Sequence, residues 1–384
     1  MSCAKRNRWH RRIRFSLLTA SALAGIYAAD VSATDTHDAP TTITLPGAQV
    51  FPESITSTSD GTVYIGSLGE GGVLRAAAGA RHAVPFIHPG SFESHSIFGV
   101  LADERSGTLW ACSNDLSERG IRVGRPPPEA GHSTESPAPT DSAPSPGAAP
   151  SREPAPSTES AQAPGTSTAS ADSSPQGSGS ALLAFDLKSG HGKLRVTLPG
   201  EHPLCNDVAI GPDGSAYVTD MLAGQILRLK HGTHAFEVWS ADPQFLVDGT
   251  GSLDGIAFGG DGNLYVDTFT TGRLYRITVH NGVAAKVTRM TLSRPLANPD
   301  GLRLVAGDSF VLVEGAGRLD RVRVNDTHAT IDTIKDGYAG PTGVTLQSGT
   351  AWVSEGQLGI IFDPARKGQA PHLPFKAYAV DVVQ

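Results

Sequence analysis

Along most of the chain, apolar and polar residues alternate in short runs that are separated by Gly-containing turns. The same arrangement recurs in five segments, which begin at Pro52, Cys205, Leu253, Pro299 and Pro341. In three of them Asp-Gly joins two alternating runs, as in "GPDGSAYV". Asp-Gly at such a junction indicates a β-hairpin, because Gly adopts the positive φ that the turn requires. The pattern predicts repeated antiparallel strands and almost no helix.

A sixth copy of this arrangement is split in two. "IFGVLADERSGTLWACSND", from Ile97, supplies two strands, and "ALLAFDL", from Ala181, supplies the third. The 56 residues 125–180 between them are rich in Pro, Ser and Ala. Such a composition buries too little apolar surface to become ordered. We interpret this tract as a disordered, low-complexity insertion inside one repeat, and not as a linker between domains.

The repeats have a nearly constant length once the insertion is set aside. The residues that lead the six copies are 45, 108, 48, 46 and 42 residues apart, and without the insertion the second spacing is 52. Six antiparallel units of this size, each too small to bury its own face, predict an all-β, six-bladed β-propeller. Tandem β-sandwiches are the alternative. The leading residues are Glu53, Phe98, Asn206, Asp254, Asp300 and Thr342.

Both ends of the repeat region are strand-like. "TTITL" begins at Thr41 and "FKAYAVDVV" begins at Phe375. A propeller must close its ring, so we expect these two ends to complete the last blade.

The first 33 residues have the pattern of a signal peptide. The basic stretch "MSCAKRNRWHRRIRF" precedes the apolar run "SLLTASALAGIYAA", and "VSA" ends at Ala33 with small residues. This run is shorter than the roughly 20 residues that span a membrane. We expect residues 1–33 to be removed and the mature domain, residues 34–384, to be exported into a periplasm or secreted.

Charge and cysteine content narrow the possible partners and the compartment. The net charge is −7 and the basic residues beyond the signal are scattered, which argues against nucleic acid and leaves a small-molecule substrate. No membrane association is expected after signal cleavage. Cys112 and Cys205 remain when Cys3 is removed with the signal. An oxidising compartment favours their pairing, and two buried free thiols are the alternative.

The leading residues are candidates for a functional site, because the first strand of each blade lines the central channel of a propeller. Four of the six carry carboxylate or amide oxygens: Glu53, Asn206, Asp254 and Asp300. Two carboxylates roughly 5 Å apart repel each other by about 3 kcal/mol at an effective dielectric constant of ~20. A divalent cation would cancel that repulsion. Oxygen ligands favour Ca²⁺, with Mg²⁺, Mn²⁺ and Zn²⁺ open. Capping of a local turn by Asp is the alternative interpretation.

At these positions the chain resembles the family of senescence marker protein, gluconolactonase and luciferin-regenerating enzyme. The metal-binding Glu, Asn and Asp of that family are matched by Glu53 in "FPESI", Asn206 in "CNDVAIGPDG" and Asp300 in "NPDGL". The blade between the last two usually carries Asn in "NGL", where this chain has Asp254 in "LDGIAF". "ESI" also replaces the first-blade "EGP" of the family. The resemblance covers the mature chain apart from the insertion.

The resemblance implies a propeller with one divalent metal at the channel mouth, in a family of which many members hydrolyse sugar lactones or related esters. Asp300 would be both a metal ligand and the general base. Asp254 adds a negative charge, which favours metal binding and weakens the metal as a Lewis acid. Two alternatives therefore stay open: a secreted ligand-binding or scaffold propeller with a structural metal, and a calcium-dependent lactonase or esterase of the paraoxonase type.

Other polar residues are expected near the same mouth. His95 and His202 precede the second and third blades and are candidates for substrate binding, with plain solvation as the alternative. Four acidic residues near the ends of second strands are candidates to support the site from behind: Asp220, Asp267, Glu314 and Glu355.

Overall fold

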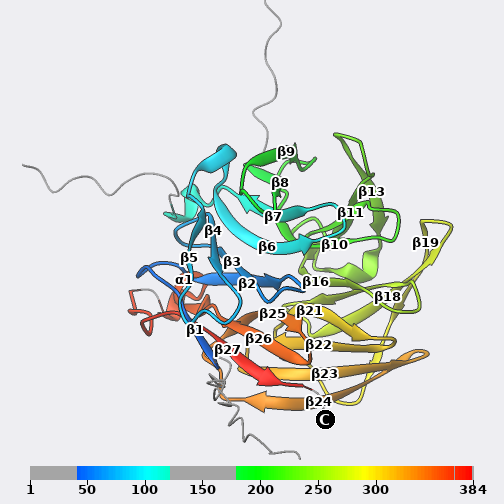
Figure 1. The fold of residues 1–384 in the computed structure, drawn as a ribbon. Helices are drawn as coiled ribbons and strands as arrows, with labels where there is room; N and C mark the ends of the chain where they lie inside the picture. Colours follow the sequence, from blue (N-terminus) through cyan, green and yellow to red (C-terminus); the bar gives the residue numbers. More distant parts are fainter. Residues whose placement is uncertain (1–40, 122–178, 367, 383–384) are drawn as a thin grey trace, which may run out of the picture. The chain divides into compact units, whose positions relative to one another are not determined.

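The computed structural model describes residues 41–121, 179–366 and 368–382. These residues are almost entirely β-structure and form a six-bladed β-propeller, as the repeats predicted (Figure 1). Within the described ranges, no helix is long and apolar enough to cross a membrane. The predicted signal peptide and most of the predicted insertion lie outside the described residues.

Each of the first three blades is a sheet of four consecutive antiparallel strands. Blade one contains β2 (Pro52–Ser57), β3 (Val63–Ser67), β4 (Val73–Ala76) and β5 (Val84–Ile87). Blade two contains β6 (Ser96–Asp103), β7 (Thr108–Asn114), β8 (Ser180–Asp186) and β9 (Gly192–Thr197). Blade three contains β10 (Cys205–Ile210), β11 (Ala216–Asp220), β12 (Gln225–Leu229) and β13 (Phe236–Ala241).

The remaining blades follow the same plan, with a fifth strand in blade five and a shared sheet in blade six. Blade four contains β16 (Leu253–Phe258), β17 (Leu264–Thr268), β18 (Arg273–His280) and β19 (Val283–Arg289). Blade five contains β20 (Thr291–Leu292), β21 (Pro299–Ala306), β22 (Ser309–Glu314), β23 (Arg318–Asn325) and β24 (His328–Asp336). Blade six contains β25 (Pro341–Gln347), β26 (Thr350–Glu355), β27 (Lys376–Asp381) and β1 (Thr42–Thr44).

Short elements lie in the connections between strands. A two-stranded ribbon, β14 (Leu246–Val247) with β15 (Thr250–Gly251), precedes blade four. Helical turns occur at η1 (Ser91–Glu93), η2 (Ser117–Arg119), η3 (Pro243–Phe245), α1 (Gly359–Phe362) and η4 (Pro364–Arg366).

The ring closes through the two ends of the described chain, as expected. β1 pairs with β27 in antiparallel register, with Ile43 opposite Ala377. The two strands lie side by side in Figure 1 although they come from opposite ends of the sequence. The first strand of each blade contacts the first strands of both neighbouring blades, and β25 contacts β2. Six first strands therefore surround one central channel.

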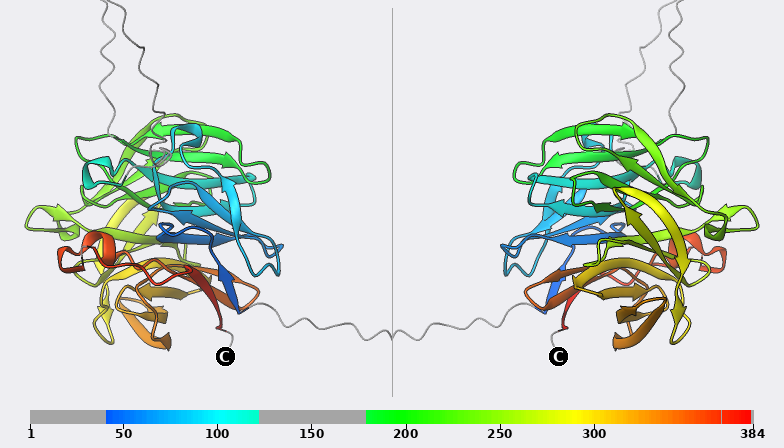
Figure 2. Two further views of the ribbon diagram at one scale, coloured as in Figure 1. Left: turned by 90° about the vertical axis from the view of Figure 1, so that its left-hand side faces the viewer. Right: turned by 90° about the vertical axis from the view of Figure 1, so that its right-hand side faces the viewer.

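The hydrophobic core is divided among the blade interfaces. Each of six clusters of buried side chains joins two neighbouring blades. One example packs Tyr265 of blade four on Phe310 of blade five, with ring centroids 4.8 Å apart. The views from the two sides show the sheets following one another around the ring in chain order (Figure 2). Each alternating strand thus buries apolar residues against the adjacent blades, as the repeat pattern requires.

The position of the insertion within one blade is confirmed. β7 and β8 flank residues 122–178 and pair in unbroken register from Thr108 and Asp186 to Asn114 and Ser180. One boundary needs correction, because Ser180 was assigned to the insertion and is the first residue of β8. Its hydroxyl donates to the carbonyl oxygen of Pro203 at 2.7 Å, which ties it to the ordered sheet region.

Candidate functional site

A β-bulge stands at the start of the first strand in all six blades. At each bulge the pairing with the second strand shifts register, and each predicted leading residue lies inside the shifted interval. Bulges re-aim side chains at strand ends and often occur next to functional sites. The intervals are Pro52 to Ile55, Ile97 to Val100, Cys205 to Val208, Leu253 to Ile256, Pro299 to Leu302 and Pro341 to Gly343.

All six leading residues line one cavity of about 600 Å³. Every one of them is buried, with exposed fractions from 3% for Asn206 to 7% for Asp300. Residues that are separated by up to 289 positions in sequence, from Glu53 to Thr342, therefore meet at one place on the channel axis. The placement of Glu53, Asn206, Asp254 and Asp300 at one cavity agrees with the sequence analysis. Their roles as ligands stay a prediction.

No ion pair with Glu53, Asp254 or Asp300 occurs among the described residues, and the nearby Arg303 is paired with Asp207. Burial, followed by repulsion from Asp254 and Glu53, raises the pKa of Asp300 well above its usual range. Burial and then repulsion from Asp254 act in the same direction on the pKa of Glu53. Burial and then repulsion from Asp207 raise the pKa of Asp254 to about 8. The protein therefore does not offset the negative charge that these carboxyl groups would carry when ionised.

Asn206 and Asp254 are directly joined. The Asn206 Nδ2 atom donates to Asp254 Oδ1 at 2.6 Å. This hydrogen bond leaves the Asn206 amide oxygen with no hydrogen bond from the described residues. An amide in this orientation presents its oxygen as a ligand for a hard cation.

Asp-Gly occurs at two kinds of position, in the hairpin turn and at the start of the first strand of a blade. The backbone differs between the two. At the hairpins, Gly214 and Gly262 have positive φ, and Asp213 Oδ1 accepts the backbone N–H of Ser215. At the cavity, Gly255 and Gly301 are outside the positive-φ set. No comparable turn bond to Asp254 or Asp300 occurs among the described residues. Capping of a turn therefore accounts for the hairpin aspartates and not for those at the cavity.

The glycines beside the cavity aspartates serve packing between blades. A Cβ atom added to Gly255 would lie 2.2 Å from the Asp300 carbonyl oxygen, and one added to Gly301 would lie 3.0 Å from the Gly343 Cα atom. Neighbouring first strands approach so closely at these positions that a side chain does not fit. The "DG" pair thus combines a residue at the cavity with a residue that lets the ring close.

Asp207 and Arg303 form an ion pair that the sequence analysis missed. The Arg303 guanidinium donates to Asp207 Oδ2 at 2.7 Å and to Oδ1 at 3.1 Å, and Asp207 Oδ2 also accepts the Ile256 N–H. Arg303 stands three residues after Asp300 on β21, so the pair lies farther along the channel. The sequence did contain a signal for this pair, because Asp207 directly follows Asn206 in a strand that is otherwise apolar.

The residues at the cavity suit a hard divalent cation in their chemistry. Three carboxylates and one amide oxygen form an oxygen-only donor set with excess negative charge, which Ca²⁺ prefers. In the described part of the chain, no three Asp, Glu, His or Cys side chains lie close enough together to hold a metal ion. The donor set therefore needs the Asn206 oxygen, and the carboxylates would have to close around the ion.

Three of the four acids expected behind the site bind backbone instead. Asp220 accepts the Leu204 N–H at 3.0 Å, Glu355 accepts the Ala339 N–H at 2.8 Å, and Glu314 accepts the Ala297 N–H. Each bond holds the connection that enters the first strand of the same blade. The fourth acid, Asp267, is fully buried and accepts the N–H of Gly255, so it supports the bulge that contains Asp254.

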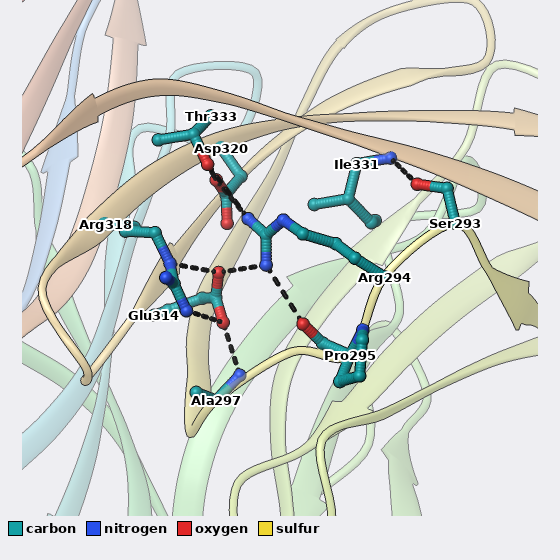
Figure 3. Close-up of polar contacts among 9 residues, drawn as sticks. All are labelled: Ser293, Arg294, Pro295, Ala297, Glu314, Arg318, Asp320, Ile331 and Thr333. Carbon is teal, nitrogen blue, oxygen red and sulfur yellow. Dashed lines mark hydrogen bonds and ion pairs between the residues drawn. The ribbon is translucent and has the colours of Figure 1, made fainter.

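Glu314 belongs to a second acidic cluster, whose side chains are not among those that line the cavity (Figure 3). Arg294 contacts Glu314 Oε1 at 2.7 Å and Asp320 Oδ1 at 2.6 Å. Arg318 Nε contacts Glu314 Oε1 at 3.0 Å. Burial opposes ionisation of Glu314, but hydrogen bonds from Asp320, Arg318 and the Ala297 amide hold its pKa well below the usual range. Burial, followed by the hydrogen bond to Glu314, raises the pKa of Asp320 to about 6. Both carboxyl groups of this cluster nevertheless have an arginine partner.

Cys112 and Cys205 form a disulfide, the pairing that an oxidising compartment favoured. Their Cα atoms are 5.2 Å apart, and the bond joins β7 of blade two to β10 of blade three. Next to it, the Asn114 side chain donates to the Cys205 carbonyl oxygen at 2.8 Å and accepts its N–H at 3.0 Å. The backbone that enters Asn206 is thus fixed by one covalent bond and two hydrogen bonds.

The two candidate histidines do not reach the cavity. His202 is exposed and His95 is partly exposed, and neither is among the residues that line it. Solvation is the interpretation that the structure favours for both.

Comparisons with known proteins identify the fold. No family model matches the chain, and no curated protein matches it. Among solved structures, a gluconolactonase from Xanthomonas campestris is similar with a TM-score of 0.53 and 13% identity, covering 88% of each chain. Regucalcin, a calcium-binding protein from Agrobacterium tumefaciens, has a TM-score of 0.52 and 13% identity, over 89% of this chain and 97% of the other.

A third similar structure is the PQQ-bound aldose sugar dehydrogenase from Streptomyces coelicolor, with a TM-score of 0.51 and 12% identity, over 88% of this chain and 97% of the other. A lactonase, a calcium-binding protein and a dehydrogenase thus share one architecture with this chain. Identity at this level establishes the β-propeller fold, and the activity has to be argued from the site.

Proposed function

We propose that the protein is a metal-dependent hydrolase that opens a lactone or a related ester. The observation that carries this proposal is the convergence of Glu53, Asn206, Asp254 and Asp300 at one cavity with unbalanced negative charge. The similarity to a gluconolactonase and to a calcium-binding propeller supports it. Strongly perturbed carboxyl groups in a cavity are typical of functional sites.

The residues at the cavity would divide the reaction between them. A divalent cation held by the four side chains would polarise the ester carbonyl, stabilise the developing oxyanion and offset the repulsion between carboxylates. Asp300 takes the proton from the attacking water. Burial of the Asp300 carboxylate favours its protonated form, which suits a group that accepts a proton. Asn206 fixes Asp254 through its 2.6 Å hydrogen bond.

Elemental analysis combined with assays on a panel of lactones and esters tests the proposal. We expect one divalent cation per chain, loss of hydrolysis after chelation and recovery when the cation is added back. Asp254→Asn should lower the affinity for Ca²⁺ at least tenfold, because one anionic ligand is removed. A chain that holds its cation and hydrolyses no lactone or ester would instead be a ligand-binding propeller.

That second function is favoured by one observation. The carboxylates are not gathered closely enough to enclose an ion by themselves, and the cavity volume of about 600 Å³ is in the range of sites for organic ligands.

We also propose that the chain is exported and loses residues 1–33. The Cys112–Cys205 disulfide supports this, because disulfides persist in oxidising compartments. Amino-terminal sequencing of the mature protein should read from Thr34.

A further inference from the structure

The wall of the cavity is mostly hydrocarbon. Beyond the carboxylates, side chains from four blades form its sides, and two of the apolar residues, Leu222 and Phe362, are more than a third exposed. Leu222 lies in the β11–β12 turn, and Phe269 directly follows β17. These turns surround the channel mouth. The apolar wall, as we use the term below, consists of Phe98, Leu204, Met221, Leu222, Phe269 and Leu358.

The polar groups on the same wall are already bonded to the protein. Gln357 donates its Nε2 to the His372 carbonyl oxygen at 3.0 Å and accepts the His372 N–H at 2.9 Å. The Thr342 hydroxyl donates to the Pro52 carbonyl oxygen at 2.8 Å. The Asn298 Nδ2 donates to a backbone carbonyl at 3.3 Å. Asp363 also lines the cavity, but it is exposed and accepts the Ala365 N–H at 2.9 Å. The amide and hydroxyl groups on the wall therefore offer few free donors and acceptors to the hydroxyl groups of a ligand.

One basic residue lines the cavity at its rim. Arg366 is exposed and its Nε donates to Gln369 Oε1 at 3.2 Å. Its position in solvent makes it a weak partner for a ligand held against the apolar wall.

A sugar lactone matches this environment poorly. It carries a hydroxyl group on nearly every carbon, and each hydroxyl that leaves water without a new partner opposes binding. A hydrocarbon chain loses nothing on leaving water and packs favourably on Leu, Met and Phe side chains. The volume of about 600 Å³ is also that of sites that enclose drug-sized ligands rather than a single sugar ring.

We propose that the substrate of this site is a lactone or ester whose carbonyl lies at the carboxylates and whose non-reacting part is a hydrocarbon chain or ring packed on the apolar wall. The reaction named in this proposal rests on the proposed function. The binding preference does not, because it follows from the apolar wall alone.

Hydrolysis of a graded series of substrates provides the first test. The series is δ-valerolactone with alkyl tails of zero, three, five and seven carbons, compared with glucono-δ-lactone. We expect kcat/KM to rise about fourfold per methylene until the wall is covered, the factor that corresponds to burial of one CH₂ group. A flat series, or preference for glucono-δ-lactone, would overturn the proposal.

Binding of analogues that cannot be hydrolysed separates this proposal from the proposed function. The probes are the matching δ-lactams with the same alkyl tails, measured by calorimetry on the mature protein. Tighter binding with each added methylene, without hydrolysis of any lactone, would sustain the apolar preference and refute the hydrolase. Hydrolysis of lactones with lactam affinity independent of tail length would sustain the hydrolase and refute the apolar preference.

A wall variant and a matched control locate the effect. Leu222→Asn changes a residue that is 37% exposed, so the fold should tolerate it. We expect the affinity for the seven-carbon lactam to fall about tenfold and its increase per methylene to shrink. Val283→Asn, at a residue that is 59% exposed at the start of β19, should leave the affinity unchanged. Equal losses in both variants would contradict the assignment of the wall.

Discussion

Two clusters of buried acidic side chains in the described part of the chain differ in how their charge is offset. In blade five, Glu314 and Asp320 contact Arg294, and Glu314 also contacts Arg318 (Figure 3). At the channel mouth, Glu53, Asp254 and Asp300 have no arginine of their own, because the nearby Arg303 is paired with Asp207. A carboxylate that the fold itself neutralises contributes to structure. One that the fold leaves unbalanced is available to a cation or a substrate.

The two clusters also differ in how they are built. The blade-five cluster joins a connecting segment to the strands of one blade, through Arg294 and the Ala297 N–H. The mouth residues come from separate blades and meet only because the ring closes. We infer that substitution in the first cluster affects mainly stability and substitution in the second affects mainly activity.

The largest effect is expected for Asp300→Asn. The amide cannot accept the proton from water, so kcat should fall by about 10³-fold, within the range that general-base catalysis contributes. The free energy of unfolding of the metal-free protein should not decrease, because one repulsive charge is removed. Steady-state kinetics and urea unfolding measure the two quantities.

Asp308→Asn is the matched control for that variant. Asp308 is exposed in the β21–β22 turn of the same blade, away from the cavity. It should behave like the unmodified chain in both measurements. Full turnover by Asp300→Asn in a protein that retains its cation would remove Asp300 from the mechanism.

Arg294→Met should show the reverse pattern. It leaves two buried carboxyl groups short of a partner, and removal of one member of a buried ion pair costs about 3 kcal/mol or more. Because 28% of the Arg294 side chain is exposed, we expect a loss of about 2 kcal/mol in urea unfolding with kcat/KM unchanged. Arg289→Met, at an exposed arginine without an ion pair among the described residues, should lose less than about 0.5 kcal/mol. If Arg294→Met were fully folded and still lost turnover, the two clusters would not differ in the way proposed.

The architecture was predictable from sequence, because strand alternation, Asp-Gly turns and repeat length all reflect local physics. The position of the four polar residues at one cavity followed from the repeat phase, since equivalent positions in a ring face the same axis. The apolar wall did not follow. Leu222 and Phe269 lie in turns, where no strand period indicates the direction of a side chain. The pair of Asp207 and Arg303 was missed for a different reason. Regular strand alternation would place Asp207 on the face opposite Asn206, but the bulge buries both residues.

The pH dependence of stability should have opposite sign at Asp254 and at Glu314. The pKa of Asp254 is raised from 3.8 to about 8, so between these values the metal-free folded state keeps a proton that the unfolded state releases. Its contribution is full below pH of about 4 and is lost as the pH rises to about 8, by up to about 1.4 kcal/mol per pH unit. Glu314 has a lowered pKa, so its contribution is present above its usual pKa and is lost as the solution becomes more acidic.

Thermal unfolding between pH 3 and pH 9, with and without Ca²⁺, measures both trends. Ca²⁺ should reduce the alkaline decline, because the ionised carboxylates at the cavity then bind the cation. The acid decline should remain. An alkaline decline that Ca²⁺ leaves unchanged would show that the mouth carboxylates do not bind it.

The most direct test for a metal site at the cavity is a crystal structure of the mature protein grown with Mn²⁺, examined for anomalous scattering. We predict a single strong peak at the cavity, within about 2.0–2.6 Å of oxygen atoms from Glu53, Asn206, Asp254 and Asp300. A peak only elsewhere, or carboxylates at the cavity that remain apart around solvent while Mn²⁺ saturates the protein, would contradict the account.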